Sequence, residues 1–293
     1  MDVIFSSVSA PFFAQYLADI TNKKFVKWQE LRNRKFRKCH LFLVGLYFPE
    51  HRIYTQLSHF KSIVILFAGS DLLKLNDLNS HKRNAIFNRL KKHGAVFATE
   101  SPEIQSRIKD IYNLDTEVVY LPSKHKFSKT PLPMPDKFSI GCYMPDTLKK
   151  KFYGYKTVIQ VVKKLEDVDF HFYSLVGYSA NKDEKRMKNL KCHKSSVSDM
   201  RNFLGSISCG LRLTDHDTYS MSAIDYVMSG RWFINNHIMP YCDKISLHAN
   251  VDEIVAVIND IRDRGGWNMK GLESYQNKHD VKVFYKRIKS ILR

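Results

Sequence analysis

The stretch CGLRLTDHDTYSMSAIDYVMSGRWFINN, residues 209–236, decides the fold. Residues 209–214 form a short apolar strand candidate, 220–230 a helix candidate and 231–236 a second strand candidate. Short apolar runs of this kind are expected for parallel strands that are buried on both faces. The order therefore predicts a strand–helix–strand unit of a parallel sheet.

The same alternation continues through the rest of the chain. Further strands are expected at 1–7, 40–48, 62–70, 94–100, 116–123, 138–144 and 169–177. Further helices are expected at 11–20, 81–94, 101–113, 155–167, 198–207 and 280–293. The helix at 101–113 has a good beginning, because Ser101 can cap it, Pro102 suits its first turn and Glu103 suits the positive end of its dipole.

The segment 123–139 interrupts this alternation. It contains three prolines and has no periodicity, which is typical of a linker. Two alternating sets joined by such a linker predict an α/β protein of two doubly wound, Rossmann-like domains facing a cleft. The expected domains are 1–134 and 135–280, followed by a helix at 281–293 that can cross back to the first domain.

Composition and cysteine spacing narrow the class of protein. Apolar residues make up 44% of the 293 residues, enough for a real core, and no stretch is long and apolar enough to span a membrane. The N-terminus lacks the pattern of a signal peptide. The five cysteines are widely spaced and form no C-x-x-C pair, so reduced thiols in a cytoplasmic protein are expected, with no disulfide framework and no metal site.

The net charge is the most unusual feature of the composition. The chain has 47 basic and 29 acidic residues, a formal charge of +18. Such a field favours a polyanionic partner, either DNA or an anionic membrane surface. Basic clusters lie at 32–40, 81–93 and 282–293, and the last supplies the contact candidates Lys282, Lys286 and Arg287. The alternative is a set of solvated helix faces without a charged partner.

Two carboxylates in the deciding stretch carry the chemistry. Asp217 and Asp225 are eight positions apart, and Thr218, Tyr219 and Ser220 lead from the first into the helix. A helix N-terminus attracts phosphate, a carboxylate inside the helix can accept hydrogen bonds from ribose, and one before the helix can contact a sugar. An amphipathic helix with a capping aspartate is the alternative interpretation.

This stretch resembles the signature of retaining GT-B glycosyltransferases related to glycogen synthase. Asp217 and Asp225 stand at the positions of that family's two Glu. Thr214 stands at the Ser of its signature and Gly230 at its closing Gly, while Ser220 replaces the Gly of the turn. The two carboxylates are each one methylene shorter than in the family.

The resemblance extends over most of the chain. Residues 138–144 and 153–177 resemble the opening of the family's donor domain, with Gly154 at the Gly of a Lys-Gly pair and Tyr153 in place of the Lys. Residues 62–73 resemble a strand that ends in His-Gly-Ser-Asp. There Gly69, Ser70 and Asp71 match, and Ala68 takes the place of the His.

The resemblance implies the GT-B fold and a sugar transferase that retains anomeric configuration. The first domain would be on the acceptor side, and the second would bind a nucleotide-sugar donor, with a UDP-sugar favoured and no metal required. Asp217 would contact the sugar, while Asp225, Thr218, Tyr219 and Ser220 would bind the donor. One of Lys149 and Lys151 would reach the diphosphate.

Asp71 and Ser70 are the acceptor-side candidates. Asp71 would orient or deprotonate an acceptor hydroxyl, or else cap the following helix.

Three interpretations of the acceptor remain open at this stage. The basic charge resembles that of phage glucosyltransferases that modify hydroxymethylated bases in DNA, which would make DNA the acceptor. The alternative acceptor is a lipid, lipopolysaccharide or polysaccharide at an anionic membrane surface, with residues 9–28 as the docking stretch. The third interpretation is a catalytically inactive nucleic-acid-binding module on the same scaffold.

Overall fold

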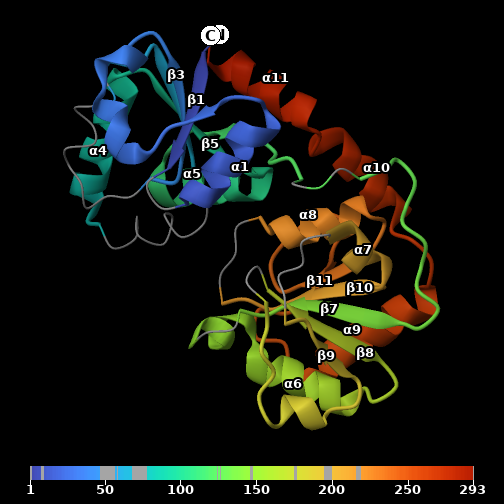
Figure 1. The fold of residues 1–293 in the computed structure, drawn as a ribbon. Helices are drawn as coiled ribbons and strands as arrows, with labels where there is room; N and C mark the ends of the chain where they lie inside the picture. Colours follow the sequence, from blue (N-terminus) through green and yellow to red (C-terminus); the bar gives the residue numbers. More distant parts are fainter. Residues whose placement is uncertain are drawn as a thin grey trace. The chain divides into compact units, whose positions relative to one another are not determined.

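The structure is a computed structural model. It describes residues 2–7, 10–46, 57, 59–67, 78–123, 125, 127–145, 148–174, 177–194, 200–215 and 219–292. The chain divides into two compact units, Met1–Lys124 with Lys278–Arg293, and His125–Asn277. Figure 1 shows a parallel sheet with helices in each unit.

The sheet of the first unit has six parallel strands in the order β2-β1-β3-β4-β5-β6. The strands are β1 (Val3–Ser7), β2 (Lys24–Phe25), β3 (His40–Val44), β4 (Ser62–Leu66), β5 (Ala95–Thr99) and β6 (Glu117–Val118). All five residues of β1 and of β3 are buried. Burial on both faces explains why their sequences are continuous apolar runs.

The helices of the first unit come from both ends of the chain. They are α1 (Pro11–Ile20), α4 (Ser80–Lys92), α5 (Pro102–Tyr112) and α11 (Val281–Ile291), with short 3₁₀ turns η1 (Trp28–Arg32) and η2 (Arg34–Phe36). The beginning of α5 is as expected, because the Ser101 hydroxyl accepts a hydrogen bond from the Ile104 amide at 3.3 Å.

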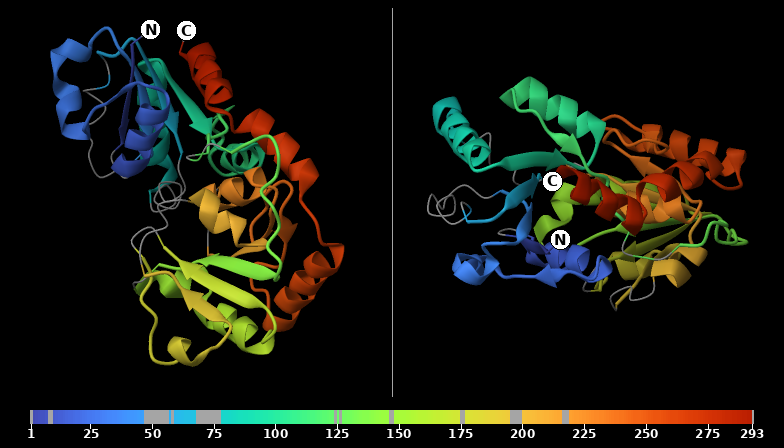
Figure 2. Two further views of the ribbon diagram at one scale, coloured as in Figure 1. Left: turned by 45° about the vertical axis from the view of Figure 1, so that its right-hand side comes forward. Right: turned by 90° about the horizontal axis from the view of Figure 1, so that it is seen from above.

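Helix α11 packs on the first sheet. The ring of Phe284 lies 5.9 Å from that of Phe42, and the Ser62 hydroxyl donates to the Leu292 carbonyl at 3.3 Å. The C-terminal helix therefore belongs to the first unit, with the two chain ends near each other (Figures 1 and 2).

The sheet of the second unit has six parallel strands in the order β12-β11-β10-β7-β8-β9. The strands are β7 (Ser139–Tyr143), β8 (Asp169–Tyr173), β9 (Leu190–Cys192), β10 (Cys209–Arg212), β11 (Trp232–Asn235) and β12 (Asp243–Lys244). Counted from the first strand of this unit, the order is 6-5-4-1-2-3, which is that of a dinucleotide-binding Rossmann fold. The chain leaves β7 and β10 in opposite directions, so these neighbours form the topological switch point.

Helices cover both faces of the second sheet. Helices α6 (Tyr155–Lys164) and α9 (Val251–Arg264) enclose one apolar core, in which Val158 and Ile258 pack with Phe170. Helices α7 (Met200–Gly205) and α8 (Met221–Met228) cover the other face (Figure 1). The remaining elements are α10 (Met269–Lys278), η3 (Leu148–Tyr153) and η4 (Glu184–Arg186).

Both parallel α/β sheets expected from the sequence are confirmed. Sequence analysis missed α9, α10 and three short edge strands, β2, β9 and β12. Helix α9 carried a visible signal, since Ile254, Ile258 and Ile261 recur at helical spacing after the cap Asn250. Edge strands of two or three residues are too short to show a period.

The proline-rich linker is tied to the second unit from its middle onward. The Arg231 guanidinium is fully buried and donates to the carbonyls of Leu132 and Pro133, and Trp267 Nε1 donates to Leu132 O at 2.9 Å. The compact unit that contains these bonds begins at His125, whereas the sequence analysis expected the boundary between residues 134 and 135. The assignment of an acceptor side and a donor side to the two units stays a prediction.

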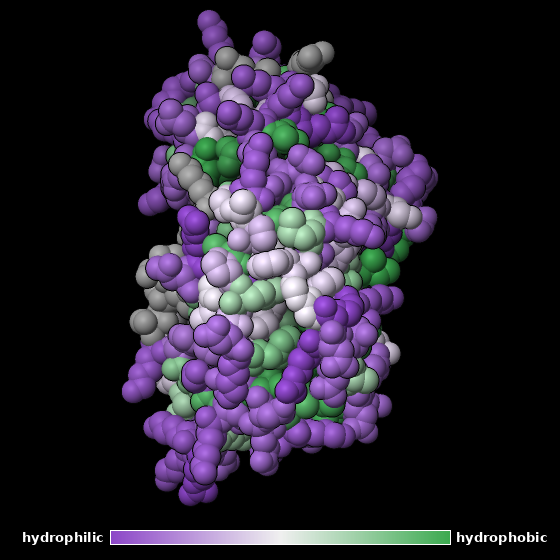
Figure 3. Space-filling view, turned by 90° about the vertical axis from the view of Figure 1, so that its right-hand side faces the viewer, coloured by the Kyte–Doolittle hydropathy of each residue, from purple (hydrophilic) through white to green (hydrophobic). Residues whose placement is uncertain are grey.

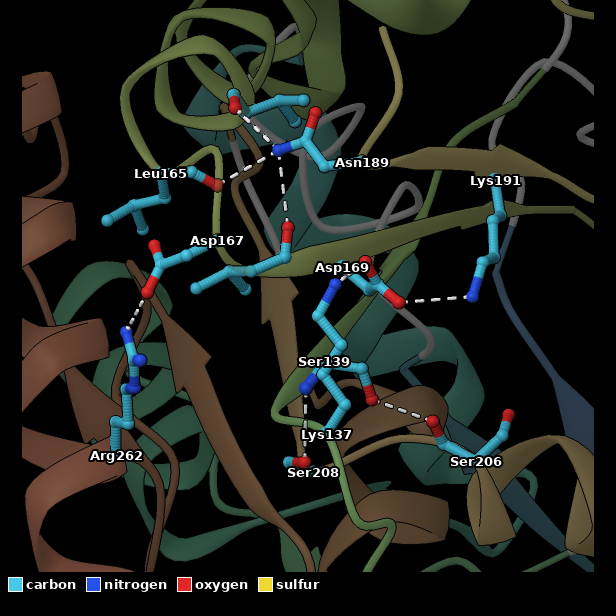
Figure 4. Close-up of polar contacts among 12 residues, drawn as sticks. Lys137, Ser139, Leu165, Asp167, Asp169, Asn189, Lys191, Ser206, Ser208 and Arg262 are labelled. Carbon is cyan, nitrogen blue, oxygen red and sulfur yellow. Dashed lines mark hydrogen bonds and ion pairs between the residues drawn. The ribbon is translucent and has the colours of Figure 1, made fainter.

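A polar network holds the amino ends of β7 and β8 (Figure 4). Asn189 Nδ2 lies 2.9, 2.9 and 3.2 Å from the carbonyl oxygens of Val162, Leu165 and Val168. Asp169 forms ion pairs with Lys137 at 2.6 Å and with Lys191 at 3.1 Å. Ligands of doubly wound sheets bind at the opposite, carboxyl edge, so this network stabilises the fold.

A stacked histidine pair makes the second unit sensitive to acid. His171 is buried, and its Nδ1 lies 3.1 Å from Nε2 of His193. Burial, together with nearby His193 and Lys191, lowers the pKa of His171 from 6.5 to about 4. The unfolded chain therefore binds more protons than the folded one between these values, and stability is lost as the pH falls through this range.

We expect the parent protein to lose about 2 kcal/mol more than a His171→Phe variant between pH 7 and pH 5, since each pH unit below 6.5 costs about 1.4 kcal/mol. Urea unfolding at the two pH values measures this difference. Exposed His248 provides the control, because His248→Asn should lose as much stability as the parent. An equal loss in the parent and in His171→Phe would contradict the assignment.

Candidate functional site

The carboxyl edge of the second sheet at the switch point is the expected ligand site. In open α/β sheets, ligands bind outside the carboxyl ends of the strands where the strand order reverses. Here that point lies between β7, which ends at Tyr143, and β10, which ends at Arg212. The segments that follow these strands lead into α6 and α8.

Two glycines let α8 approach this edge closely. Gly141 and Gly210 are register partners on β7 and β10. A Cβ atom on Gly141 would lie 1.9 Å from the Tyr226 hydroxyl oxygen, and one on Gly210 would lie 2.9 Å from the Tyr226 ring and 2.4 Å from Phe233. The paired glycines therefore make room for Tyr226 of α8 against the sheet.

This packing predicts a specific double-mutant result. Gly141→Ala should lower the free energy of unfolding by about 1–3 kcal/mol, the usual cost of overpacking a core. Adding Tyr226→Phe should recover part of the loss, because the nearest remaining ring carbon is 3.1 Å from the added Cβ. Urea unfolding of the two single variants and the double variant measures the coupling.

Gly205 supplies the matched control for this cycle. A Cβ on Gly205 would meet no atom within 4 Å, so Gly205→Ala should be nearly neutral. Strictly additive effects of Gly141→Ala and Tyr226→Phe would contradict the close approach.

The beginning of α8 is fixed by residues that sequence analysis assigned to donor binding. The Ser220 hydroxyl accepts a hydrogen bond from the Ala223 amide at 3.3 Å and lies 2.8 Å from the Ser222 hydroxyl. Tyr219 is buried. The pKa of Tyr275 in α10 is raised first by the burial of Tyr275 itself, then by Cys242 and then by Tyr219. Both residues thus have structural roles, and any donor contact they make stays a prediction.

Asp225 lies inside α8 and is 7% exposed. Its Oδ2 is 3.9 Å from Nε2 of His125, a linker residue that sequence analysis did not single out. Burial raises the pKa of Tyr173 at the end of β8, and the Asp225 carboxylate adds to that rise, while the Tyr226 hydroxyl and Arg212 oppose it. A carboxylate therefore stands near the carboxyl ends of the strands.

The segment after β10 is clamped to the segment after β11. The Thr214 amide donates to Asn236 Oδ1 at 3.0 Å, and Asn236 Nδ2 donates to the Thr214 carbonyl at 2.9 Å. His237 Nε2 lies 2.9 Å from the same carbonyl. This reciprocal pair of bonds fixes the start of the acidic stretch, a role that needs the tertiary structure to be seen.

Arg212 is the most notable residue that sequence analysis missed. Its guanidinium carbon lies 5.1 Å from the centre of the Tyr153 ring and 5.8 Å from that of Tyr143. Tyr153 is the residue that stands in place of the lysine in the resembling Lys-Gly pair. A strand residue among apolar neighbours gave no sequence signal of a ligand site.

The three lysines after β7 have different surroundings. Lys150 Nζ donates to the Tyr178 hydroxyl at 2.7 Å and lies 3.7 Å from the buried Glu184 carboxylate. Lys151 is exposed, with Nζ 5.0 Å from the Phe152 ring. The Lys149 side chain lies outside the part of the chain that the structure describes.

Glu184 holds the segments after β7 and β8 together. Burial opposes its ionisation, but hydrogen bonds from Tyr155 and Tyr178 lower its pKa below the usual value. The same carboxylate and burial raise the pKa of Tyr155 to about 12. Lys150 is thus part of a structural network, and the preference for Lys149 and Lys151 as diphosphate contacts stays a prediction.

Several expected site residues lie outside the described residues: Asp71, Ser70, Asp217 and Thr218. Their proposed roles stay predictions. Lys282, Lys286 and Arg287 are exposed on α11. Arg287 pairs with Glu117 at 2.5 Å and donates to the Val118 carbonyl, so part of its charge serves to hold α11 on the first unit.

Two searches of the described residues bear on the class of protein. No group of three or more His, Cys, Asp or Glu side chains there could hold a metal ion. No helix among them is long and apolar enough to cross a membrane.

Two comparisons of the sequence with known proteins found no match. No model of a protein family matches the chain, and no curated protein matches it.

Comparison with solved structures yields glycosyltransferases. WaaB, a lipopolysaccharide outer core galactosyltransferase, matches at 11% identity and a TM-score of 0.65 over 100% of this chain and 99% of its own. Sucrose-phosphate synthase from Thermosynechococcus elongatus matches at 8% identity and a TM-score of 0.64, over 99% and 98% of the two chains.

The pneumococcal O-GlcNAc transferase GtfA, solved with UDP and GlcNAc, matches at 12% identity and a TM-score of 0.62. The match covers 90% of this chain and 58% of GtfA, so this chain spans little more than half of that protein's length. At such low identities the likeness establishes the fold. The chain has the GT-B fold, as the sequence resemblance implied.

Proposed function

We propose that this protein is a retaining glycosyltransferase that takes a sugar from a nucleotide-sugar donor, with a UDP-sugar favoured. One observation supports it most: α8 begins at the switch point of a Rossmann sheet and carries the buried carboxylate Asp225. The full-length likeness to GT-B transferases and the UDP bound to GtfA agree with this proposal.

Donor binding would use α8 and the segment before it. The positive end of the α8 dipole would face phosphate, and Asp225 would accept hydrogen bonds from the ribose hydroxyls. Asp217, with Thr218 before the helix, would stand near the transferred sugar. Lys149 or Lys151 after β7 would reach the diphosphate, and Asp71 with Ser70 would serve the acceptor.

A thermal-shift screen tests the donor proposal. A ligand that binds only the folded state stabilises it by about 2.7 kcal/mol at 100 times its dissociation constant, which raises the melting temperature. We expect a UDP-sugar to give the largest shift among UDP-, ADP- and GDP-sugars. The absence of a shift with any of them, and of slow donor hydrolysis, would favour an inactive binding module.

For the acceptor, we propose a hydroxyl of a lipid-linked or polysaccharide substrate at an anionic membrane surface. Basic side chains surround aromatic rings on the first unit. Lys23 and Lys289 lie 5.4 and 4.6 Å from the Tyr285 ring, and Lys24 and Lys35 lie 5.7 and 5.1 Å from the Phe36 ring. Such a combination suits anionic headgroups.

Hydrophilic side chains predominate on the face drawn in Figure 3. The likeness to WaaB, a lipopolysaccharide outer core galactosyltransferase that is matched over 99% of its own length, agrees with this choice of acceptor.

DNA carrying hydroxymethylated bases is the second candidate acceptor, and the formal charge of +18 favours it. The exposed Lys282 and Lys286 on α11 separate the two candidates. If DNA is bound there, reversing both charges to Glu should reduce the slope of log affinity against log salt by about 2, since each phosphate contact contributes roughly 0.9.

The matched control reverses Lys182 and Lys188, two exposed lysines of the second unit. Binding of the parent to vesicles of anionic lipid, without binding to duplex DNA at low salt, would support the membrane acceptor. Binding to DNA alone would overturn it.

A further inference from the structure

Arg212 lies where a donor diphosphate would be expected. It is the last residue of β10, beside Tyr143, the last residue of β7, on the two strands that form the switch point. Because side chains alternate along a strand, Arg212 and Tyr143 share the sheet face of Gly210 and Gly141, the face that α8 covers. The guanidinium and α8 are therefore on one side of the sheet, at its carboxyl edge.

Aromatic rings hold the guanidinium in place. Tyr153 and Tyr143 lie 5.1 and 5.8 Å from it, and the Tyr143 ring lies 5.4 Å from Tyr153 and 5.8 Å from Tyr173. A guanidinium stacked on aromatic faces keeps its charge and its planar fork of donors, which matches the geometry of phosphate. The residue is only partly buried, so a ligand can reach it.

The field of Arg212 acts on its neighbours at this edge. Burial raises the pKa of Tyr143, and the guanidinium opposes that rise. Burial also raises the pKa of Tyr173. The Arg212 guanidinium opposes that rise, and the Asp225 carboxylate adds to it. A cation and a carboxylate thus act on the same strand ends. Lys150, which follows β7, contacts Tyr178 and Glu184.

We infer that Arg212, supported by the Tyr143 and Tyr153 rings, binds the diphosphate of the nucleotide-sugar donor. The principal phosphate cation of this site would then come from β10. Lys149 and Lys151, which follow β7, would be secondary phosphate contacts. This inference rests on the proposed function and assigns a residue to it.

Binding of diphosphate and nucleoside can be measured separately by calorimetry. Arg212→Gln should weaken UDP binding by about 10- to 100-fold, the usual effect of losing charge-assisted hydrogen bonds, and leave uridine binding unchanged. Arg212→Lys should be intermediate, because it keeps the charge without the fork. Arg201→Gln, at an exposed arginine of the same unit, should bind UDP as the parent does.

Two outcomes would overturn the inference. Equal losses of UDP and uridine affinity would indicate that Arg212 only shapes the site. An unchanged UDP affinity, with the loss appearing in Lys151→Gln instead, would assign the diphosphate to the segment after β7.

Inorganic pyrophosphate distinguishes failure here from failure of the proposed function. If the parent binds pyrophosphate and Arg212→Gln does not, while UDP, ADP and GDP bind to neither, the anion site stands and the nucleotide-sugar proposal falls. If the parent binds neither pyrophosphate nor any of the three nucleotides, the anion site and the nucleotide-sugar proposal are both wrong.

Discussion

Asp217→Asn is expected to lower the turnover number by about 10²- to 10³-fold while changing donor affinity little. The reason is the position of Asp217 four residues before the start of α8, where a carboxylate would lie next to the transferred sugar. Positive charge develops on the sugar in the transition state, and groups that stabilise such charge have effects of this size. Initial rates with saturating nucleotide-sugar, together with donor affinity by calorimetry, measure the two effects.

Asp215 is the matched control for this experiment. It is an exposed carboxylate two positions earlier in the same segment, so Asp215→Asn should keep most of the activity. Full turnover in Asp217→Asn would show that the spacing of the two carboxylates is accidental. An equal loss in both variants would indicate a general effect of charge on the segment.

Asp225→Asn is expected to weaken donor binding by about 10- to 100-fold and to leave the fold intact, as expected for the loss of hydrogen bonds to a charged group. The substitution keeps the shape of a side chain that is 7% exposed in α8, so packing around Tyr226 should persist. Comparing UDP with a nucleotide that lacks the ribose hydroxyls isolates the contact between Asp225 and the ribose. The parent should discriminate between the two ligands, and the variant should not.

Asp263 provides a charge-matched control, since it is exposed on α9 of the same unit. Asp263→Asn should bind both ligands as the parent does. If Asp225→Asn keeps the parent's affinity for UDP, Asp225 does not contact the donor.

The sequence predicted most elements of the fold, whereas the roles of the expected site residues stay predictions. Long apolar strands such as His40–Val44 and capped helices such as Pro102–Tyr112 carry their signals locally. Two-residue strands such as Asp243–Lys244 have no such signal. They form because an edge of the sheet offers unpaired backbone groups, which is a property of the assembled sheet.

The residues of the candidate site divide in the same way. Asp225 was visible because its spacing from Asp217 and its place in a helix are local features. Arg212, Asn236 and His125 were not visible, since each acquires its role from a partner distant in the sequence. Asn236 reaches back 22 positions to Thr214, and His125 lies 100 positions before Asp225.

By itself the sequence determined two parallel α/β sheets, a proline-rich linker and an acidic stretch that enters a helix, because periodicity, proline and capping act over a few residues. The tertiary structure alone decided that β7 and β10 are neighbours. That pairing sets Gly141 against Gly210, admits Tyr226, and brings Arg212 onto the rings of Tyr143 and Tyr153. Strand order depends on contacts between distant segments, and no local pattern encodes it.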